Sequence, residues 1–355
     1  MSINAKESLT VWIPSALFFF WPVIACVTSN QEASAQSDWI APPALKQGDL
    51  IAFVAASGPV EVLPVETYAA QLRNDGYRVF VPAGLVTRKQ GYLAGTDDER
   101  LQELNAMIRD PNVRAIFPIR GGYGLTRILD RIDYDALRKD PKVVIGFSDV
   151  TALHLAIAKK SKLITFHSPV PMGDLWKGSD PEFSFAYSAF NRTIFAKQYT
   201  SGEQGFVIST PDGAKPESLV RGIAKGRLLG GNLTMICSTW GTPFALEPAG
   251  AILFLEDVNE APYRVDRMLS QLKLAGALDQ LAGIIVGMFT IEDAGDLVEF
   301  DRLFKEYFSA LGIPVIHRYP IGHVAKNGTL PHGALVELDA NRCEVRLLEN
   351  PVQLK

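Results

Sequence analysis

From about residue 50, short apolar runs alternate with amphipathic segments. The run "LIAFVAAS" predicts a buried strand, which Ser57-Gly58-Pro59 ends. The next apolar residues recur at helical spacing, i, i+3, i+4 and i+7, before a glycine at position 76 that is typical of a helix end. These four positions are Val65, Tyr68, Ala69 and Leu72. Further strands are predicted at "YRVFVPAG", "VRAIFPIRGGYG", "KVVIGFSD" and "LITFHSPV".

Helical segments separate these strands. The segment "TDDERLQELNAMIRD" opens with a capping box, Thr96 followed by Glu99, and its apolar residues line one face. Strands that alternate with helices predict a mostly parallel sheet with helices on both of its faces. We therefore expect an α/β fold with a Rossmann-like or flavodoxin-like N-terminal domain over residues 46–170.

The periodicity is lost between residues 171 and 220, where Gly, Ser, Pro and aromatic residues are frequent. This segment is interpreted as an inter-domain connection. Residues 221–355 then predict a smaller, mixed α/β C-terminal domain, with strands at "AILFLED" and "LAGIIVGMF" and a hairpin-like pair in "GALVELDANRCEVRLLE". A length of 355 residues is itself more than one hydrophobic core usually serves.

Residues 1–45 have a different pattern and are predicted to be an export signal and tether. The apolar run "VWIPSALFFFWPVIA" is shorter than the roughly 20 residues that span a bilayer, and it comes after a short polar segment. Two processing sites compete: a lipobox-like "VIAC" that would leave a lipid on Cys26, and "ASA" with cleavage after Ala35. The protein is thus expected to be exported, either periplasmic or lipid-anchored in the cell envelope.

Composition and motif searches exclude several classes of function. A net charge of −4 without a long basic run argues against nucleic acid as a partner. No CxxC, Cys/His spacing or HExxH suggests a metal, and Cys237 lies in an apolar stretch where a buried, inert thiol is expected. A dinucleotide fingerprint and a P-loop lysine are also missing, so neither a metal nor another cofactor is predicted.

Functional groups of an open α/β sheet gather at the carboxyl ends of its strands. Three such ends carry them here: residues 120–124 (RGGYG), residues 146–149 (GFSD), and Glu256-Asp257. The glycines of RGGYG form either a simple tight turn or a set of close backbone donors for a developing negative charge. Ser148 is either a helix cap or a nucleophile raised on a sharp strand-to-helix turn, with the amide of Asp149 as an oxyanion donor.

A serine nucleophile needs a base and an acidic partner. The five histidines are His154, His167, His317, His323 and His332, and spacing alone does not choose among them. Side chains alternate along a strand, so Glu256 and Asp257 face opposite ways and only one of them can reach a given site.

Several motifs together resemble one family. "RGGYGLTRILDRIDYDAL", "GFSDVTALHLAI", "GRLLGGNLTMICSTWGTPF", "LFLEDVNEAPYRVDRMLSQL" and "IGHVAKNGTLPHGA" are similar, in order, to motifs of the LD-carboxypeptidases of peptidase family S66. The resemblance implies a Ser-Glu-His triad of Ser148, Glu256 and His323, in a cleft between the two domains. It also implies oxyanion donors at the amides of Asp149 and Gly122, with Gly121 as the next choice. The exported N-terminus is a departure, because the best-known bacterial members are cytoplasmic.

The family's substrate is a murein tetrapeptide, from which the terminal D-alanine is removed. An exopeptidase must bind a free carboxylate, so Arg120 is a candidate clamp and Asn232 a candidate substrate donor, with Arg227 and Arg264 as further arginines near the motifs. Two alternatives stay open: a relative that hydrolyses peptidyl-nucleotide antibiotics, with Trp176 and Phe185 available for base stacking, and a non-catalytic binder of cell-wall peptides. The preferred diamino acid and the choice between monomer and homodimer also stay open.

Overall fold

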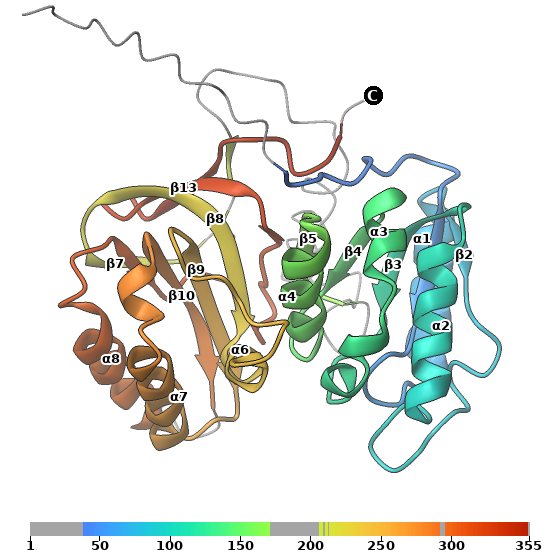
Figure 1. The fold of residues 1–355 in the computed structure, drawn as a ribbon, viewed down its shortest axis with the longest axis horizontal. Helices are drawn as coiled ribbons and strands as arrows, with labels where there is room; N and C mark the ends of the chain where they lie inside the picture. The colour runs from blue at the N-terminus through green and yellow to red at the C-terminus, as the bar shows by residue number, and fades with distance from the viewer. Residues whose placement is uncertain (1–37, 171–205, 209, 212, 292–294, 354–355) are drawn as a thin grey trace, which may run out of the picture. The chain divides into compact units, whose positions relative to one another are not determined.

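Two β-sheets form the framework of the chain, and the strand–helix alternation seen in the sequence builds both of them (Figure 1). The computed structural model describes residues 38–170, 206–208, 210–211, 213–291 and 295–353. The predicted export signal with Cys26 and Ala35 lies outside these residues, as do Trp176 and Phe185. Within the described part of the chain, no helix combines the length and apolar character that a membrane crossing requires.

The first sheet has six strands in the order β12-β5-β4-β3-β1-β2. Strands β1 to β5 run parallel in the order 2-1-3-4-5, which is the flavodoxin-like arrangement and confirms the predicted fold class. Their bounds are β1 (Leu50–Val54), β2 (Arg78–Phe80), β3 (Val113–Pro118), β4 (Val143–Gly146) and β5 (Thr165–His167). The last strand, β12 (Leu330–His332), comes from far along the chain and pairs antiparallel with β5.

Helices cover both faces of this sheet. Helix α1 (Val62–Asn74) packs on one face through the predicted stripe of Val65, Tyr68, Ala69 and Leu72, and the other helices pack on the opposite face. These are α2 (Asp97–Arg109), α3 (Tyr134–Lys139) and α4 (Val150–Ser161), with the short 3₁₀ turns η1 (Leu125–Arg127) and η2 (Leu129–Arg131) between β3 and α3. Both hydrogen bonds of the Thr96–Glu99 capping box are present at the start of α2.

The second sheet is mixed, with the order β6-β14-β13-β8-β9-β10-β11-β7. Its centre, from β8 to β11, is parallel, and the flanking strands are antiparallel. The strands are β6 (Phe206–Val207), β7 (Glu217–Val220), β8 (Ile223–Asn232), β9 (Ile252–Val258), β10 (Gly283–Thr290), β11 (Val315–His317), β13 (Leu335–Asp339) and β14 (Glu344–Leu347). The helices are α6 (Leu233–Thr239), α7 (Pro262–Leu274) and α8 (Gly295–Phe308), with the 3₁₀ turn η4 (Leu278–Gln280).

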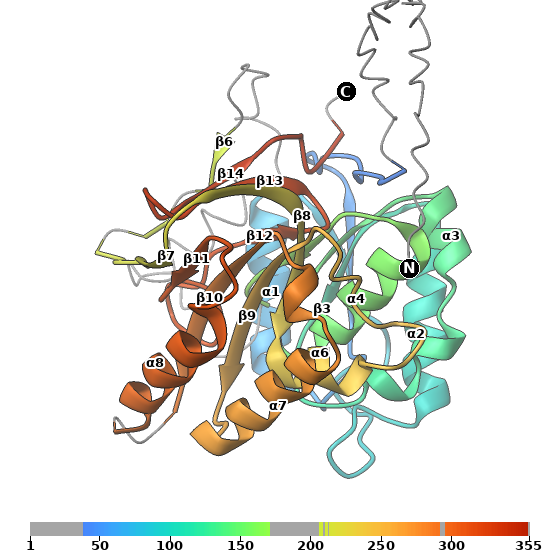
Figure 2. The ribbon, with the colours of Figure 1, turned by 60° about the vertical axis from the view of Figure 1, so that its left-hand side comes forward.

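Buried side chains join the two sheets into one framework. Helices α6, α7 and α8 cover one face of the second sheet, while Phe254 and Ile285 on its other face share a core with Ile145 and Phe166 of the first. Figure 2 shows α4 beside α6 and β8, where the two halves of the chain meet. The carboxyl ends of β4, β8 and β9 therefore lie close together.

Candidate active site

Ser148 occupies the sharp turn between β4 and α4 that the sequence pattern predicts. Its backbone is left-handed, with φ of 62°, a conformation that costs a non-glycine residue free energy and that is concentrated at functional sites. The turn is tight, because a methyl group added at Gly146 would lie 2.6 Å from a methyl group of Val150. Ser148 is half-buried rather than enclosed in the core. The turn thus presents its hydroxyl at the end of the sheet.

The glycine loop after β3 lies directly against this serine. A methyl group added at Gly121 would lie 3.0 Å from Cβ and 3.2 Å from Oγ of Ser148, whereas one at Gly122 would meet Gly58 instead. The carbonyl of Gly121 accepts a hydrogen bond of 3.1 Å from the amide of Gly58. The absence of a side chain at position 121 therefore favours this close approach of the backbone to the hydroxyl.

Glu256 and His323 form a hydrogen-bonded pair. Oε2 of Glu256 lies 2.7 Å from Nδ1 of His323. The carboxyl group is completely buried at the end of β9, and burial raises its pKa, while the hydrogen bond and charge of His323 act in the opposite direction. The pair depends on Gly322, which has φ of 117° and whose added methyl group would lie only 2.9 Å from Cβ of Glu256.

The His323 ring also packs beside the serine turn. Its centroid lies 4.7 Å from that of Phe147, the residue that precedes Ser148. Within the described residues, the His323 ring makes a hydrogen bond to Glu256 and none to Ser148. Catalytic hydrogen bonds are often long in a ligand-free protein and tighten when substrate binds.

The other four histidines have different environments. His154, His167 and His332 are fully buried, and His154 stacks on His332 with ring centroids 5.7 Å apart. Burial lowers the pKa of all three, to about 4 for His154, so their rings are neutral. His317 lies between the carboxylates of Glu217 and Asp301 on β7 and α8. His323 is the one whose ring is paired with the acid of β9.

Asp257 has other hydrogen-bond partners than the Glu256–His323 pair. Its carboxylate accepts hydrogen bonds from the amide and hydroxyl of Thr234, both 2.9 Å, and from Nδ2 of Asn232 at 2.8 Å. The side-chain oxygen of Asn232 caps α6 by accepting from the amide of Met235. Both polar groups of Asn232 thus have protein partners beside the site, and its predicted substrate contact stays a prediction.

The three arginines near the motifs have different partners. Arg120 is exposed next to the glycine loop, and its Nη1 donates to the carbonyl of Pro59 at 2.7 Å. Arg227 forms an ion pair with Glu349, and Arg264 is paired with Glu260. Arg120 is therefore the one placed beside the serine turn.

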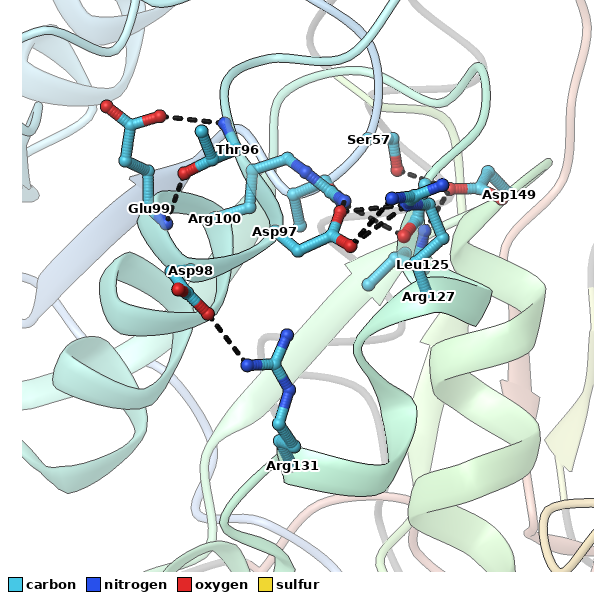
Figure 3. Close-up of polar contacts among 12 residues, drawn as sticks. Ser57, Thr96, Asp97, Asp98, Glu99, Arg100, Leu125, Arg127, Arg131 and Asp149 are labelled. Carbon is cyan, nitrogen blue, oxygen red and sulfur yellow. Dashed lines mark hydrogen bonds and ion pairs between the residues drawn. The ribbon is translucent and has the colours of Figure 1, made fainter. Parts of the chain in front are cut away.

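A buried polar network behind the glycine loop was not anticipated from the sequence (Figure 3). Oδ2 of Asp149 accepts from the hydroxyl of Ser57 at 2.6 Å and from the amide of Leu125 at 3.0 Å. Arg100, fully buried on α2, donates to the carbonyls of Ala56 and Gly124. The sequence signal for Ser57 was its position at the end of the apolar run that predicts the first strand. Arg100 gave no such signal, because a charged helix residue is normally solvent-exposed.

The remaining polar clusters give no metal site. Across the described residues, no group of three or more His, Cys, Asp and Glu side chains is arranged to hold a metal ion. Cys237 is only partly accessible, and burial raises the pKa of its thiol to about 12, which keeps it protonated at neutral pH.

Comparison with known protein families gives two matches, one in each half of the chain. Residues 51–168 match the LD-carboxypeptidase N-terminal domain, and residues 225–338 match the LD-carboxypeptidase C-terminal domain. A probable murein peptide carboxypeptidase of Bacillus subtilis is 35% identical over 82% of this chain and 89% of its own length. A murein tetrapeptide carboxypeptidase of Pseudomonas aeruginosa is 31% identical over 82% of this chain and 94% of its own length.

Solved structures show the same two-domain fold. Muramoyltetrapeptide carboxypeptidase from Oxalobacter formigenes superimposes with a TM-score of 0.70 and 30% identity, over 84% of this chain and 97% of that one. The microcin C7 self-immunity protein MccF, in complex with glutamyl sulfamoyl guanosine, gives a TM-score of 0.77 and 27% identity, over 88% of this chain and 99% of that one.

Proposed function

Because this chain belongs to the LD-carboxypeptidase family, peptidase family S66, we propose that it removes the terminal D-alanine from murein tetrapeptides as a serine carboxypeptidase. The observation that carries the proposal is the position of the His323 ring. Glu256 binds its Nδ1, and the ring of Phe147, the residue before Ser148, packs against it. These two contacts support a triad in which the acid, the imidazole and the serine come from distant parts of the chain.

The proposed mechanism assigns one role to each group. Nδ1–H of His323 donates to Glu256, which leaves Nε2 as the lone-pair nitrogen that takes the Ser148 proton. Oγ attacks the carbonyl carbon of the last peptide bond, and Glu256 stabilises the imidazolium that forms. The proton then passes to the leaving amine of D-alanine, and water releases the peptide from Ser148 by the reverse roles.

Backbone amides are proposed to hold the negative oxygen of the tetrahedral intermediate. The amide of Asp149 stands at the N-terminus of α4, where it has no acceptor within the helix. The Gly121 carbonyl is bonded to Gly58, and in a trans peptide the N–H points opposite to the C=O, so the Gly122 amide points away from Gly58. Each such donor contributes about 3 kcal/mol to transition-state stabilisation in a serine protease.

Arg120 is proposed to bind the free carboxylate of the substrate, because its exposed guanidinium lies next to the glycine loop. Murein lies in the cell envelope, and we propose accordingly that the protein acts there after export, as the apolar N-terminal run suggests.

Replacement of Ser148 by alanine tests the proposal. The Ser148→Ala variant is expected to fold and to lose D-alanine release by at least about a thousandfold, because no nucleophile is left. Release is measured by mass spectrometry of a murein tetrapeptide digest. Ser238→Ala, an exposed serine on α6, is the matched control and is expected to keep full activity. Full activity of Ser148→Ala would reject the proposal.

A second candidate is hydrolysis of a peptidyl-nucleotide antibiotic. It is favoured by the higher TM-score with MccF, 0.77 against 0.70 for the muramoyltetrapeptide carboxypeptidase. The same triad would serve both reactions, so the two are separated by substrate. Parallel assays with a murein tetrapeptide and an aminoacyl sulfamoyl nucleoside give the ratio of their kcat/KM values, and a ratio that favours the nucleoside would replace the first proposal by the second.

A further inference from the structure

Two buried charged side chains, Asp149 and Arg100, make hydrogen bonds near the glycine loop of residues 120–124 (Figure 3). Asp149 accepts one hydrogen bond from the loop after β1, at Ser57, and one from Leu125, the residue directly after the glycine loop. Arg100 makes the complementary pair of contacts, donating to the carbonyls of Ala56 and Gly124. Each side chain therefore binds both loops, one through their donors and the other through their carbonyl oxygens.

The loop that these contacts hold is bonded to one peptide group of the glycine loop. The amide of Gly58 comes directly after Ser57 and donates to the carbonyl of Gly121. This bond links the β1 loop to the peptide between Gly121 and Gly122, whose N–H is a proposed oxyanion donor. Oxyanion stabilisation depends on donors that are fixed before the reaction, because reorientation during the reaction costs free energy.

Burial of the Asp149 carboxyl group costs desolvation free energy, which indicates a specific role for this side chain. Its side chain is 1% exposed, and Oδ1 has no hydrogen-bond partner among the described residues. Burial raises the pKa of this carboxyl group, and the bonds from Ser57 and Leu125 and the charge of Arg100 oppose that shift. A simple helix cap needs no such enclosure, and the Asp149 side chain makes no cap bond to α4.

We propose that the Asp149 side chain is a positioning residue that orients the Gly121–Gly122 peptide toward the oxyanion, with Arg100 as the second clamp on the same two loops. This inference rests on the proposed serine hydrolase function. It separates two roles of Asp149: the backbone amide acts on the substrate, and the side chain acts through the loops.

Three variants of the full-length protein test the proposal. Asp149→Ala removes both loop contacts, Asp149→Asn keeps an acceptor oxygen in the same place, and Ser57→Ala removes one contact. The first readouts are kcat and KM for a murein tetrapeptide. A further readout is the rate at which a fluorophosphonate labels Ser148, because its phosphoryl (P=O) oxygen occupies the oxyanion site. The thermal midpoint reports folding. Asp133→Ala, which removes an aspartate bonded to the Ala136 amide in the same domain, is the matched control.

Asp149→Ala is expected to lower kcat and the labelling rate about a hundredfold, as loss of one oxyanion donor does, with KM changed by less than about threefold. We expect Asp149→Asn to stay within about tenfold of the parent in kcat and Ser57→Ala to lose about tenfold, while Asp133→Ala keeps the full rate. If Asp149→Ala does not fold, the kcat of Ser57→Ala decides whether the positioning role is kept, because this variant removes one of the same contacts.

Two outcomes would overturn the positioning role, and they differ in whether the proposed hydrolase function survives. Normal labelling of the parent protein together with unchanged kcat in Asp149→Ala and Ser57→Ala would remove the positioning role and leave the proposed function intact. Absence of labelling at Ser148 in the parent protein would remove the proposed function, and the positioning role with it.

Discussion

Gly322 is the residue that allows Glu256 and His323 to meet. It has φ of 117°, and a methyl group added there would lie 2.9 Å from Cβ and 3.0 Å from Oε2 of Glu256. Gly322→Ala is therefore expected to push the carboxylate away from the imidazole and to lower kcat by about a hundredfold or more, since loss of the correct tautomer costs up to about 10⁴ in a serine protease. Steady-state kinetics with a murein tetrapeptide measures the loss.

Gly312→Ala is the matched control for this prediction. Gly312 also has positive φ, at 70°, but no atom lies within 4 Å of an added methyl group. Both variants therefore carry backbone strain, and only Gly322→Ala carries the clash. Equal kcat values for the two variants would show that the Glu256–His323 contact is not needed for the reaction.

At the scale of single residues, the sequence predicted the features that depend on local pattern and left open those that depend on long-range pairing. The turn at Ser148 follows from the strand and helix patterns on either side of it, and strand alternation predicts that only one of Glu256 and Asp257 reaches the site. The choice of His323 among five histidines came only from the family resemblance, because it requires knowing which strand ends meet. Arg100 could not be found, because its two acceptor carbonyls lie 44 and 24 residues away along the chain.

Helix α2 illustrates the scale of the element, because a local capping box closes its first turn. Thr96 accepts from the amide of Glu99 at 3.2 Å, and Glu99 accepts from the amide of Thr96 at 2.7 Å. Thr96→Ala removes the first bond and is expected to lower the free energy of unfolding by about 1 kcal/mol. Urea denaturation monitored by circular dichroism measures this change.

The control for the cap is Thr67→Ala in α1, an exposed threonine whose hydroxyl donates to the carbonyl of Leu63 inside the helix. That change is expected to be neutral or slightly stabilising, because alanine has the higher helix propensity. A loss of equal size in both variants would mean that the cap adds nothing beyond any threonine hydroxyl on a helix.

Elements with such local signals were predicted well. The stripe of α1, the capping box of α2 and the hairpin of β13 and β14 all occur where the periodicity and the cap residues place them. Strand β12 was not predicted, because three residues carry too little periodicity and its partner, β5, is more than 150 residues earlier. The predicted connection over residues 171–220 contains β7, which pairs with β11 by the same kind of long-range contact.

At the scale of the whole molecule, the alternation of strands and helices predicted two α/β units, and the flavodoxin-like order of the first sheet agrees with that prediction. The way the two sheets share a core was not predictable. Phe254 of β9 packs edge-on against His167 and His332, which belong to β5 and β12 of the other sheet. An apolar residue pattern shows that a strand is buried, but it does not show against which other strand.

The three buried histidines at this junction make a prediction for the stability of the whole fold. Burial lowers the pKa of His154 from 6.5 to about 4, and it lowers those of His167 and His332 as well. Between these pH values the unfolded chain binds more protons than the folded one, so stability is complete above about pH 6.5 and is lost as the pH falls toward 4. For His154 alone, the loss between pH 7 and pH 4.5 is about 2 kcal/mol.

The test is a comparison of denaturation curves for the parent protein and His154→Gln across this pH range. Glutamine does not titrate, and its amide can replace the contact of 2.9 Å that Nε2 of His154 makes with the Gly146 carbonyl. We expect the variant to lose about 2 kcal/mol less than the parent between pH 7 and pH 4.5. Thr165→Val, at the register partner of His332, is buried and does not titrate, so it should shift the curve equally at every pH. Parallel pH profiles for the parent and His154→Gln would contradict the prediction, because they would mean that the junction of the two sheets accepts a charged imidazole without opening.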